Sequence, residues 1–153
     1  MNVVDVMTAK PVTTGLDNTL SSALQAMHAN SCHHLPVVGS DGHLVGVISE
    51  RDCRIALNTP QAVRINWDQN PLAHQLLVRT VMTPAPIVVE PNTPASEAAR
   101  LMLVNRIGCL PVMRSETLVG IVTKFDILTA FMNIMTRDRF DEREQYNGNR
   151  LRP

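Results

Sequence analysis

The chain has 153 residues, of which 44% are hydrophobic and 18% charged, and this balance favours one folded domain or two small ones and excludes wholesale disorder. Fourteen Lys and Arg side chains balance fourteen Asp and Glu, so the net charge of zero excludes a general attraction to nucleic acid or to an anionic membrane. No apolar run is long enough to cross a bilayer, and no signal-peptide pattern opens the chain. Three cysteines without metal or disulfide spacing fit a reducing compartment, so we expect a cytoplasmic protein.

The sequence repeats itself once. Matching tripeptides recur at an offset of 75 or, after one residue is lost in a turn, of 74: Val-Met-Thr at 6–8 and 81–83, Leu-Pro-Val at 35–37 and 110–112, and Leu-Val-Gly at 44–46 and 118–120. So many matches in one register indicate a duplication. We therefore expect a first repeat at 1–57, a linker with a short helix at 58–76, a second repeat at 77–135 and a polar tail at 136–153.

The first repeat predicts a strand, a helix, two strands and a second helix. The expected elements are an extended segment at 11–14, a helix with Thr19 as N-cap, strands at 35–39 and 44–49 joined by a turn at 40–42, and a helix from Glu50. Apolar spacing places Ile55 and Leu57 on the inner side of that last helix.

The linker and the second repeat continue the same scheme. The expected elements are a short helix at 72–78, an extended segment at 87–89, a helix with Thr93 as N-cap and Pro94 as its first residue, strands at 110–113 and 118–123, and a helix from 125 to about 135. The apolar face of the helix after Pro94 is expected to consist of Ala95, Ala98, Ala99, Met102 and Leu103.

Two further features are open to alternative interpretations. Trp67, the only tryptophan, is interpreted as a core or interface residue, with ligand stacking as the alternative. The charged tail from Arg137 is expected to be solvated or mobile, with a partner-binding arm as the alternative.

Each repeat places polar side chains where a strand meets a helix, Ser49 with Asp52 and Thr123 with Asp126. In a structural interpretation the hydroxyl and the carboxylate cap the helix. In a functional interpretation the amides at the helix start hold a phosphate, and the carboxylate accepts hydrogen bonds from the two hydroxyls of a ribose. The spacing alone leaves both interpretations open.

The Val-Met-Thr start, the Leu-Pro-Val strand and the Gly-x-x-[Ser/Thr]-x-x-Asp ending of both repeats together resemble the CBS domain, and the pair resembles a stand-alone Bateman module over about residues 3–131. The resemblance implies an α/β (α+β) fold of two βαββα repeats related by a pseudo-twofold axis, with the sheets packed together and the helices outside. It also implies two clefts that bind AMP, ADP or ATP, with S-adenosylmethionine as a further candidate, and a sensing role without a catalytic cofactor.

The resemblance further implies that both repeats contribute to each cleft. In one cleft, Ser49 and Asp52 are expected to hold the ribose, with Ile87, Val88, Ile107, Gly108, Cys109 and Pro111 around the adenine. In the other, Thr123 and Asp126 are expected to hold the ribose, with Val12, Thr13, Cys32, His33, His34 and Pro36 around the base. Arg51 and Lys124 are expected to reach phosphate groups in the central gap.

The two clefts are expected to differ, because His33 and His34 occupy the positions of Gly108 and Cys109. Histidines beside a phosphate would strengthen nucleotide binding between about pH 8 and about pH 6, where imidazole gains its charge. The alternative is that one histidine faces solvent while the other packs.

No residue set suited to catalysis is found. Cys32 and His34 share a strand face, but no third group orients them, and neither a metal-binding histidine pair nor a P-loop is present. We therefore expect a regulatory, energy-sensing protein and not an enzyme, which binds an adenosine-type ligand, forms a homodimer and signals to an unidentified effector protein, without nucleic acid or membrane partners. The alternative is a structural or dimerisation module whose clefts hold no nucleotide.

Overall fold

The computed structural model describes residues 1–59 and 66–148, and the side chains of the last helix up to Arg137. The elements up to the end of the first repeat are β1 (Thr8–Ala9), β2 (Thr14–Gly15), α1 (Leu20–Ala29), β3 (His34–Val38), β4 (Leu44–Ser49) and α2 (Glu50–Ala56), preceded by the 3-10 turn η1 (Val3–Asp5). The elements that follow are η2 (Trp67–Gln69), α3 (Pro71–Gln75), α4 (Val78–Val81), β5 (Thr83–Pro84), α5 (Ala95–Val104), β6 (Cys109–Arg114), β7 (Thr117–Thr123) and α6 (Lys124–Gly148).

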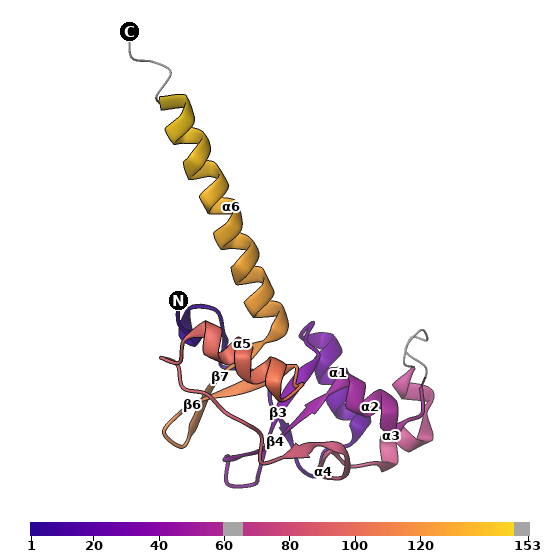
Figure 1. The fold of residues 1–153 in the computed structure, drawn as a ribbon. Helices are drawn as coiled ribbons and strands as arrows, with labels where there is room; N and C mark the ends of the chain where they lie inside the picture. Colours follow the sequence, from indigo (N-terminus) through magenta and orange to yellow (C-terminus); the bar gives the residue numbers. More distant parts are fainter. Residues whose placement is uncertain (60–65, 149–153) are drawn as a thin grey trace.

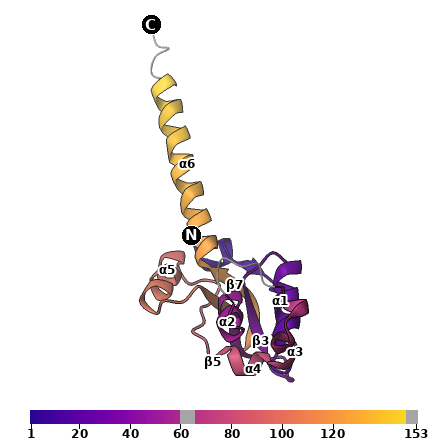
Figure 2. The same cartoon turned by 90° about the vertical axis from the view of Figure 1, so that its right-hand side faces the viewer.

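The strands form two sheets, of order β2-β3-β4-β5 and β1-β7-β6, which face each other across a small apolar cluster of Val47, Cys109 and Ile121. Helices α1 and α5 lie on opposite sides of the strands in Figure 2. Each sheet is centred on a hairpin, and the pairing of His34 with Ser49 has its counterpart in the pairing of Cys109 with Thr123. The mixed α/β fold with two sheets and helices confirms the expected fold class.

The two repeats exchange their opening segments. Strand β1 of the first repeat pairs with β7 of the second, and β5 of the second repeat pairs with β4 of the first. The residues that precede β1 and β5 in the chain pack in the same exchanged manner. Val3 belongs to the core cluster of the second half, whereas Ala73 and Val78 belong to the cluster of the first half. Each half therefore requires the other to complete its sheet and its core.

The recurring Met and Gly of the sequence repeat meet at these exchanged strands. A Cβ atom added to Gly46 would lie 2.6 Å from Met82 Sδ and 2.9 Å from the carbonyl oxygen of Thr83. At Gly120, an added Cβ would collide with Met7 Sδ and lie 3.1 Å from the carbonyl oxygen of Thr8. Glycine is thus required at both positions because the opening strand of the other repeat lies directly against the backbone.

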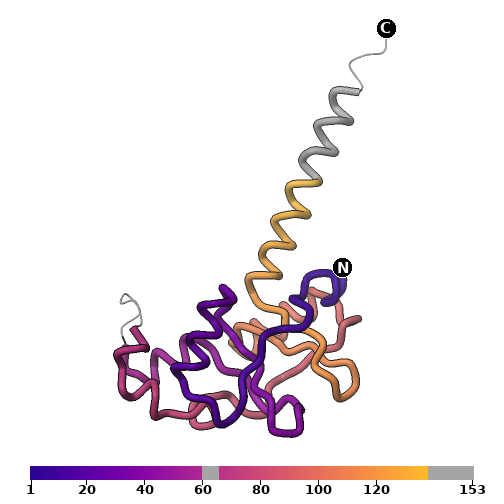
Figure 3. The backbone as a smooth tube through the Cα atoms, turned by 180° about the vertical axis from the view of Figure 1, so that it is seen from behind, coloured from indigo at the N-terminus to yellow at the C-terminus, as the bar shows by residue number. Residues whose placement is uncertain are grey.

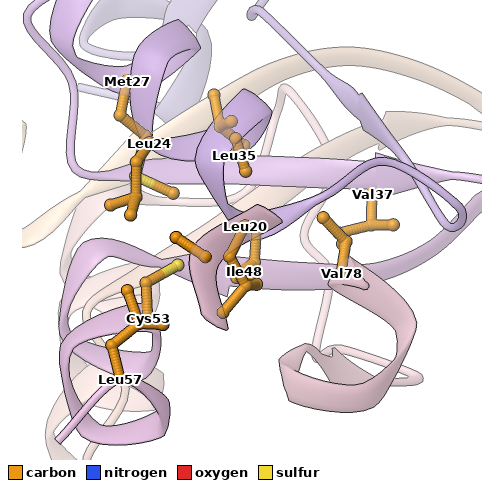
Figure 4. Close-up of a cluster of buried hydrophobic side chains, with 11 residues drawn as sticks. Leu20, Leu24, Met27, Leu35, Val37, Ile48, Cys53, Leu57 and Val78 are labelled. Atoms are coloured by element: carbon orange, nitrogen blue, oxygen red, sulfur yellow. The ribbon is translucent and has the colours of Figure 1, made fainter. Parts of the chain in front are cut away.

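The apolar periodicity of the sequence accounts for the two cores. Leu20, Leu24 and Met27 of α1 pack against Leu35 and Ile48 in the first half, as Figure 4 shows. Helix α1 begins where expected, because the Thr19 hydroxyl accepts a hydrogen bond of 3.1 Å from the Ser22 amide.

Three expectations about helix faces and caps are wrong. Ile55 is 69% exposed and Leu103 is 72% exposed, because each lies on the outer side of its helix, whereas Leu57 is buried as expected. Thr93 does not cap the helix that follows it: its hydroxyl accepts from the Glu90 amide, and α5 begins at Ala95. The Thr93 hydroxyl is therefore engaged in the turn that precedes α5 and not in capping the helix.

The linker and the last helix also differ from expectation. The short helix predicted at 72–78 is two helices, α3 and α4, because Leu76 is extended. The helix predicted to end at about residue 135 continues to Gly148, and it projects from the body in Figures 1 and 3. The expectation of a solvated tail concerns side chains after Arg137, which lie outside the described residues.

Candidate ligand-binding site

A cleft of about 1130 Å³ is lined by residues of both repeats. From the first repeat it takes His33, His34, Val47, Ser49, Glu50, Arg51, Asp52 and Arg54, and from the second Thr83, Ala85, Pro86, Ile87, Asn105, Arg106, Ile107, Gly108, Cys109 and Lys124. The volume is slightly larger than the about 300–1,000 Å³ of typical small-molecule pockets, so the cleft has room for a small organic ligand.

At this cleft, a charged residue of the first repeat influences the pKa of a residue of the second. Burial raises the pKa of the Cys109 thiol to about 12, and the negative charge of Asp52 adds to the rise. Asp52 of the first repeat therefore lies near the strand of the second repeat that carries Cys109. Of the residues expected around this site, the cleft brings Ile87, Ile107, Gly108 and Cys109 together with Ser49 and Asp52, but not Val88 or Pro111.

The turn from β4 to α2 positions Ser49 and Asp52 through a reciprocal capping box. Asp52 Oδ2 accepts 2.9 Å from the Ser49 amide and 2.7 Å from the Ser49 hydroxyl, whose oxygen accepts from the Asp52 amide at 3.1 Å. The structural interpretation of this pair is thus realised. All bonds that the carboxylate makes within the box use Oδ2, so capping leaves Oδ1 for a further hydrogen bond.

The second repeat builds the same box at the start of α6. Asp126 Oδ2 accepts 2.8 Å from the Thr123 amide and 2.7 Å from the Thr123 hydroxyl. Thr123 and Asp126 do not line the cleft described above, although their neighbour Lys124 does. The structure therefore separates the two motifs expected to hold ribose.

His34 lies in the cleft of Ser49 and Asp52, whereas the sequence analysis placed it in the other cleft. Its Nε2 atom would be 2.8 Å from a Cβ atom at Gly108, so the glycine makes room for the ring. Burial lowers the pKa of His34, the charges of His33 and Lys124 lower it further, and that of Asp52 opposes them. The charge that His34 adds between about pH 6 and about pH 8 is therefore smaller than an unperturbed imidazole would give.

His33 is turned outward, so one histidine is exposed and the other packs. Its Nδ1 atom lies 2.6 Å from Glu50 Oε2, and the Arg54 guanidinium lies 2.9 Å from Glu50 Oε1. Burial would raise the pKa of Glu50, but the bonds from His33 and Arg54 outweigh it and lower that pKa. These three side chains form a hydrogen-bonded ridge at one edge of the cleft, which we call the Glu50 ridge.

The remaining expected site residues lie outside this lining. Pro36 and Pro111 are buried within their strands, and Val12, Thr13 and Val88 are exposed. Conversely, sequence reasoning missed several residues that do line the cleft: Glu50, Arg54, Thr83, Ala85, Pro86, Asn105 and Arg106. A usable indication existed, because Thr83, Pro86 and Asn105 recur in the repeat as Thr8, Pro11 and Asn30.

Metal ligands and membrane-spanning helices can be judged for the described ranges 1–59 and 66–148. Among those residues, no group of three or more His, Cys, Asp and Glu is placed to hold a metal ion. No helix there is long and apolar enough to cross a membrane. A cytoplasmic location stays a prediction.

Comparison with known proteins gives consistent matches over most of the chain. A family model of the CBS domain matches residues 3–59 and again residues 78–133. A CBS domain-containing protein of Dictyostelium discoideum is 37% identical over 134 residues, which cover 87% of this chain and 92% of that protein.

Solved structures with the same architecture include complexes with adenosine ligands. CBSX2 of Arabidopsis thaliana in complex with AMP is 29% identical with a TM-score of 0.69, and the match covers 88% of this chain and 98% of that chain. A CBS domain pair in complex with 5′-methylthioadenosine and S-adenosyl-L-methionine is 26% identical with a TM-score of 0.71, covering 86% and 99%.

Proposed function

The chain belongs to the CBS domain family, and on that premise we propose that it is a regulatory module that binds an adenosine nucleotide between its two CBS repeats and passes a conformational signal to a partner protein. We assign the repeats to residues 1–57 and 77–135, with 58–76 as the linker and 136–153 as the tail; the two ranges that match the family model support this division. AMP, ADP and ATP are the ligands proposed first, with S-adenosylmethionine as the further candidate, and the role is regulation and not catalysis.

The observation that carries the proposal is the cleft in which Asp52 of the first repeat faces Gly108 and Cys109 of the second. A ligand held there touches both repeats at once. Binding can therefore change how the repeats sit against each other, provided that the ligand binds one arrangement more tightly than the other. The AMP and S-adenosylmethionine complexes of structural neighbours support the adenosine class of ligand.

Each part of an adenosine nucleotide has a suitable group in the cleft. Asp52 Oδ1 and the Ser49 hydroxyl are proposed to bind the ribose, because a carboxylate accepts from a diol with charge-assisted hydrogen bonds. The adenine is proposed to lie against Ile87 and Ile107, whose side chains line the same cleft. Arg51 and Lys124 are proposed to contact phosphate oxygens.

Thermal unfolding with AMP, ADP, ATP, S-adenosylmethionine and GTP tests the proposal on protein shown by its absorbance ratio to be free of nucleotide. A ligand at 100 times its Kd adds about 2.7 kcal/mol, which raises the midpoint by roughly 5–10 °C in a chain of this length. Adenosine ligands should stabilise the protein, whereas GTP should not.

Asp52→Ala and Asp126→Ala form a matched pair, because each removes the same capping bonds from one repeat. Both should lose about 1 kcal/mol of stability. Only Asp52→Ala should weaken binding in the described cleft by about tenfold or more, since a hydrogen bond to a charged group is worth about 1.5–3 kcal/mol. Equal ligand responses in both variants, or no response in the wild type, would overturn the proposed site.

We further propose that the chain forms a homodimer through the exposed apolar side of α6. The same surface would serve the alternative function, a dimerisation module without a nucleotide. Phe125, Leu128, Met132 and Met135 are all exposed and recur at the spacing of a helix–helix seam. The helix projects from the body, so this apolar row is not packed against the rest of the described chain. Such an exposed row favours packing against the same helix of a second copy.

Sedimentation of the wild type and of Met132→Asp measures this assembly. The wild type should sediment as a dimer and Met132→Asp as a monomer, while Leu72→Asp, a change on the exposed side of α3, should stay dimeric. A wild-type protein that stays monomeric at high concentration would contradict the proposed dimer. It would not bear on the ligand site, which the binding experiments above test separately.

A further inference from the structure

A second cavity, of about 770 Å³, lies beside the ligand cleft on the first repeat. It is bounded by α1, the start of α2 and the turn η2, and it shares His33, Glu50 and Arg54 with the cleft. The Glu50 ridge is therefore the boundary between the two cavities. A ligand that passes over this ridge reaches both.

The two repeats provide an internal control for whether the fold itself needs this cavity. His28, Glu50 and Arg54 line it, and the corresponding residues of the second repeat are Leu103, Lys124 and Leu128. The second repeat forms the same helices and strands without these polar groups. The polar lining is accordingly not a requirement of the fold.

The chemistry of the lining suits a flat ring. Leu24 and Met27 supply a buried apolar surface, and Trp67 is half-buried at the side. The Trp67 ring contacts His28 edge to face, with centroids 5.5 Å apart and planes at 61°, which holds the indole in a defined orientation. An oriented indole beside an apolar surface is the usual partner of a stacked base or of a cationic ring.

We propose that this cavity, here called the Trp67 subsite, takes the second planar ring of a dinucleotide whose adenosine half occupies the Asp52 cleft. This inference rests on the proposed function of that cleft. The pyrophosphate link would cross the Glu50 ridge, where the bonds from His33 and Arg54 to Glu50 offset the negative charge of that carboxylate. Arg51 and Lys124 on the cleft side add positive charge along the same path.

The fluorescence of Trp67 gives a direct measurement, because it is the only tryptophan in the chain. The probes are NAD, diadenosine diphosphate and ADP-ribose, which share the adenosine and the pyrophosphate, with AMP as the ligand of the cleft alone. NAD and diadenosine diphosphate should change the emission of Trp67, whereas ADP-ribose, which has a second ribose but no second planar base, and AMP should leave it almost unchanged. At least one dinucleotide should bind about tenfold more tightly than ADP-ribose, since base–aromatic stacking is worth that order of affinity.

Variants at Trp67 separate stacking from packing, with calorimetry as the readout. Trp67→Ala should reduce the affinity for the dinucleotide to that for ADP-ribose and leave AMP binding unchanged, which also shows that the cleft remains folded. Trp67→Phe, which keeps an aromatic face, should retain most of the preference. His28→Leu, which copies the second repeat, should weaken the preference less than Trp67→Ala does, because it removes only the group that orients the indole.

The outcomes distinguish this inference from the proposed function. If AMP binds and depends on Asp52, but neither dinucleotide exceeds ADP-ribose or affects Trp67, the Trp67 subsite is overturned and the cleft stands. If no adenosine ligand binds at all, both are overturned. A dinucleotide preference that survives Trp67→Ala would place the second ring elsewhere and also reject the subsite.

Discussion

The two strand-to-helix turns, at residues 49–52 and 123–126, are built from the same bonds but carry different side chains between them. In both, the first hydroxyl and the last carboxylate form a reciprocal capping box. The two central residues are Glu50 and Arg51 in the first turn but Lys124 and Phe125 in the second. The shared part therefore satisfies the helix terminus, and the differing part sets what each turn presents to a ligand.

The same division holds elsewhere in the repeats. Lys10 and Ala85 correspond to each other, as do Ser31 and Arg106, and all four have positive φ angles between 45° and 55°. A left-handed backbone at corresponding positions of two unlike sequences is a requirement of the fold. The side chains at these positions are free to differ, and only Ala85 and Arg106 line the described cleft.

The largest effect should come from breaking what the repeats share. Gly46→Ala and Gly120→Ala should each lower the free energy of unfolding by about 1–3 kcal/mol, because the added methyl group collides with the exchanged strand of the other repeat. Chemical denaturation measures both, with Gly15→Ala as the control, since a Cβ there has no neighbour closer than 3.6 Å. A loss at one glycine and not at the other would show that the two exchanged strands are not equivalent.

A smaller effect should follow from exchanging what the repeats do not share. Arg51→Phe gives the first turn the residue of the second, and it should lower AMP affinity by about two- to fivefold while leaving adenosine affinity unchanged, since an exposed charge contact is worth about 0.5–1 kcal/mol. Phe125→Arg, the reverse exchange, should leave binding in the Asp52 cleft unchanged. Calorimetry with both ligands measures this difference, and an equal loss for adenosine would mean that Arg51 does not contact phosphate.

The smallest effect should come from His34, for which the second repeat has Cys109. Burial lowers the pKa of His34 below its ordinary value of 6.5, so the unfolded chain takes up the proton before the folded chain does as the pH falls. The stability that neutral His34 provides is therefore present above pH 6.5 and lost as the pH falls below it. Unfolding midpoints at several pH values should fall less in His34→Asn than in the wild type, and parallel curves would show that His34 does not titrate differently in the two states.

Much of the candidate site could be predicted from the sequence because its elements are local. The capping partners Ser49 and Asp52 are three residues apart, and the strand that ends at Ser49 has a clear apolar pattern. The position of His34 could not be predicted in this way. Its place in the Asp52 cleft depends on the space left by Gly108, which belongs to the other repeat.

The sequence by itself determined the duplication, the strands of the two hairpins and the helix starts at Leu20 and Glu50, since these depend on periodicity, turn residues and caps within a few positions. Only the tertiary structure decided that β1 and β5 change places, because a two-residue strand pairs wherever a free sheet edge and a facing glycine allow it. It also decided that Ile55 and Leu103 face outward, because burial depends on which side of a helix meets the sheet. Contacts between residues distant in the sequence thus set the cleft, while local chemistry set the parts from which it is built.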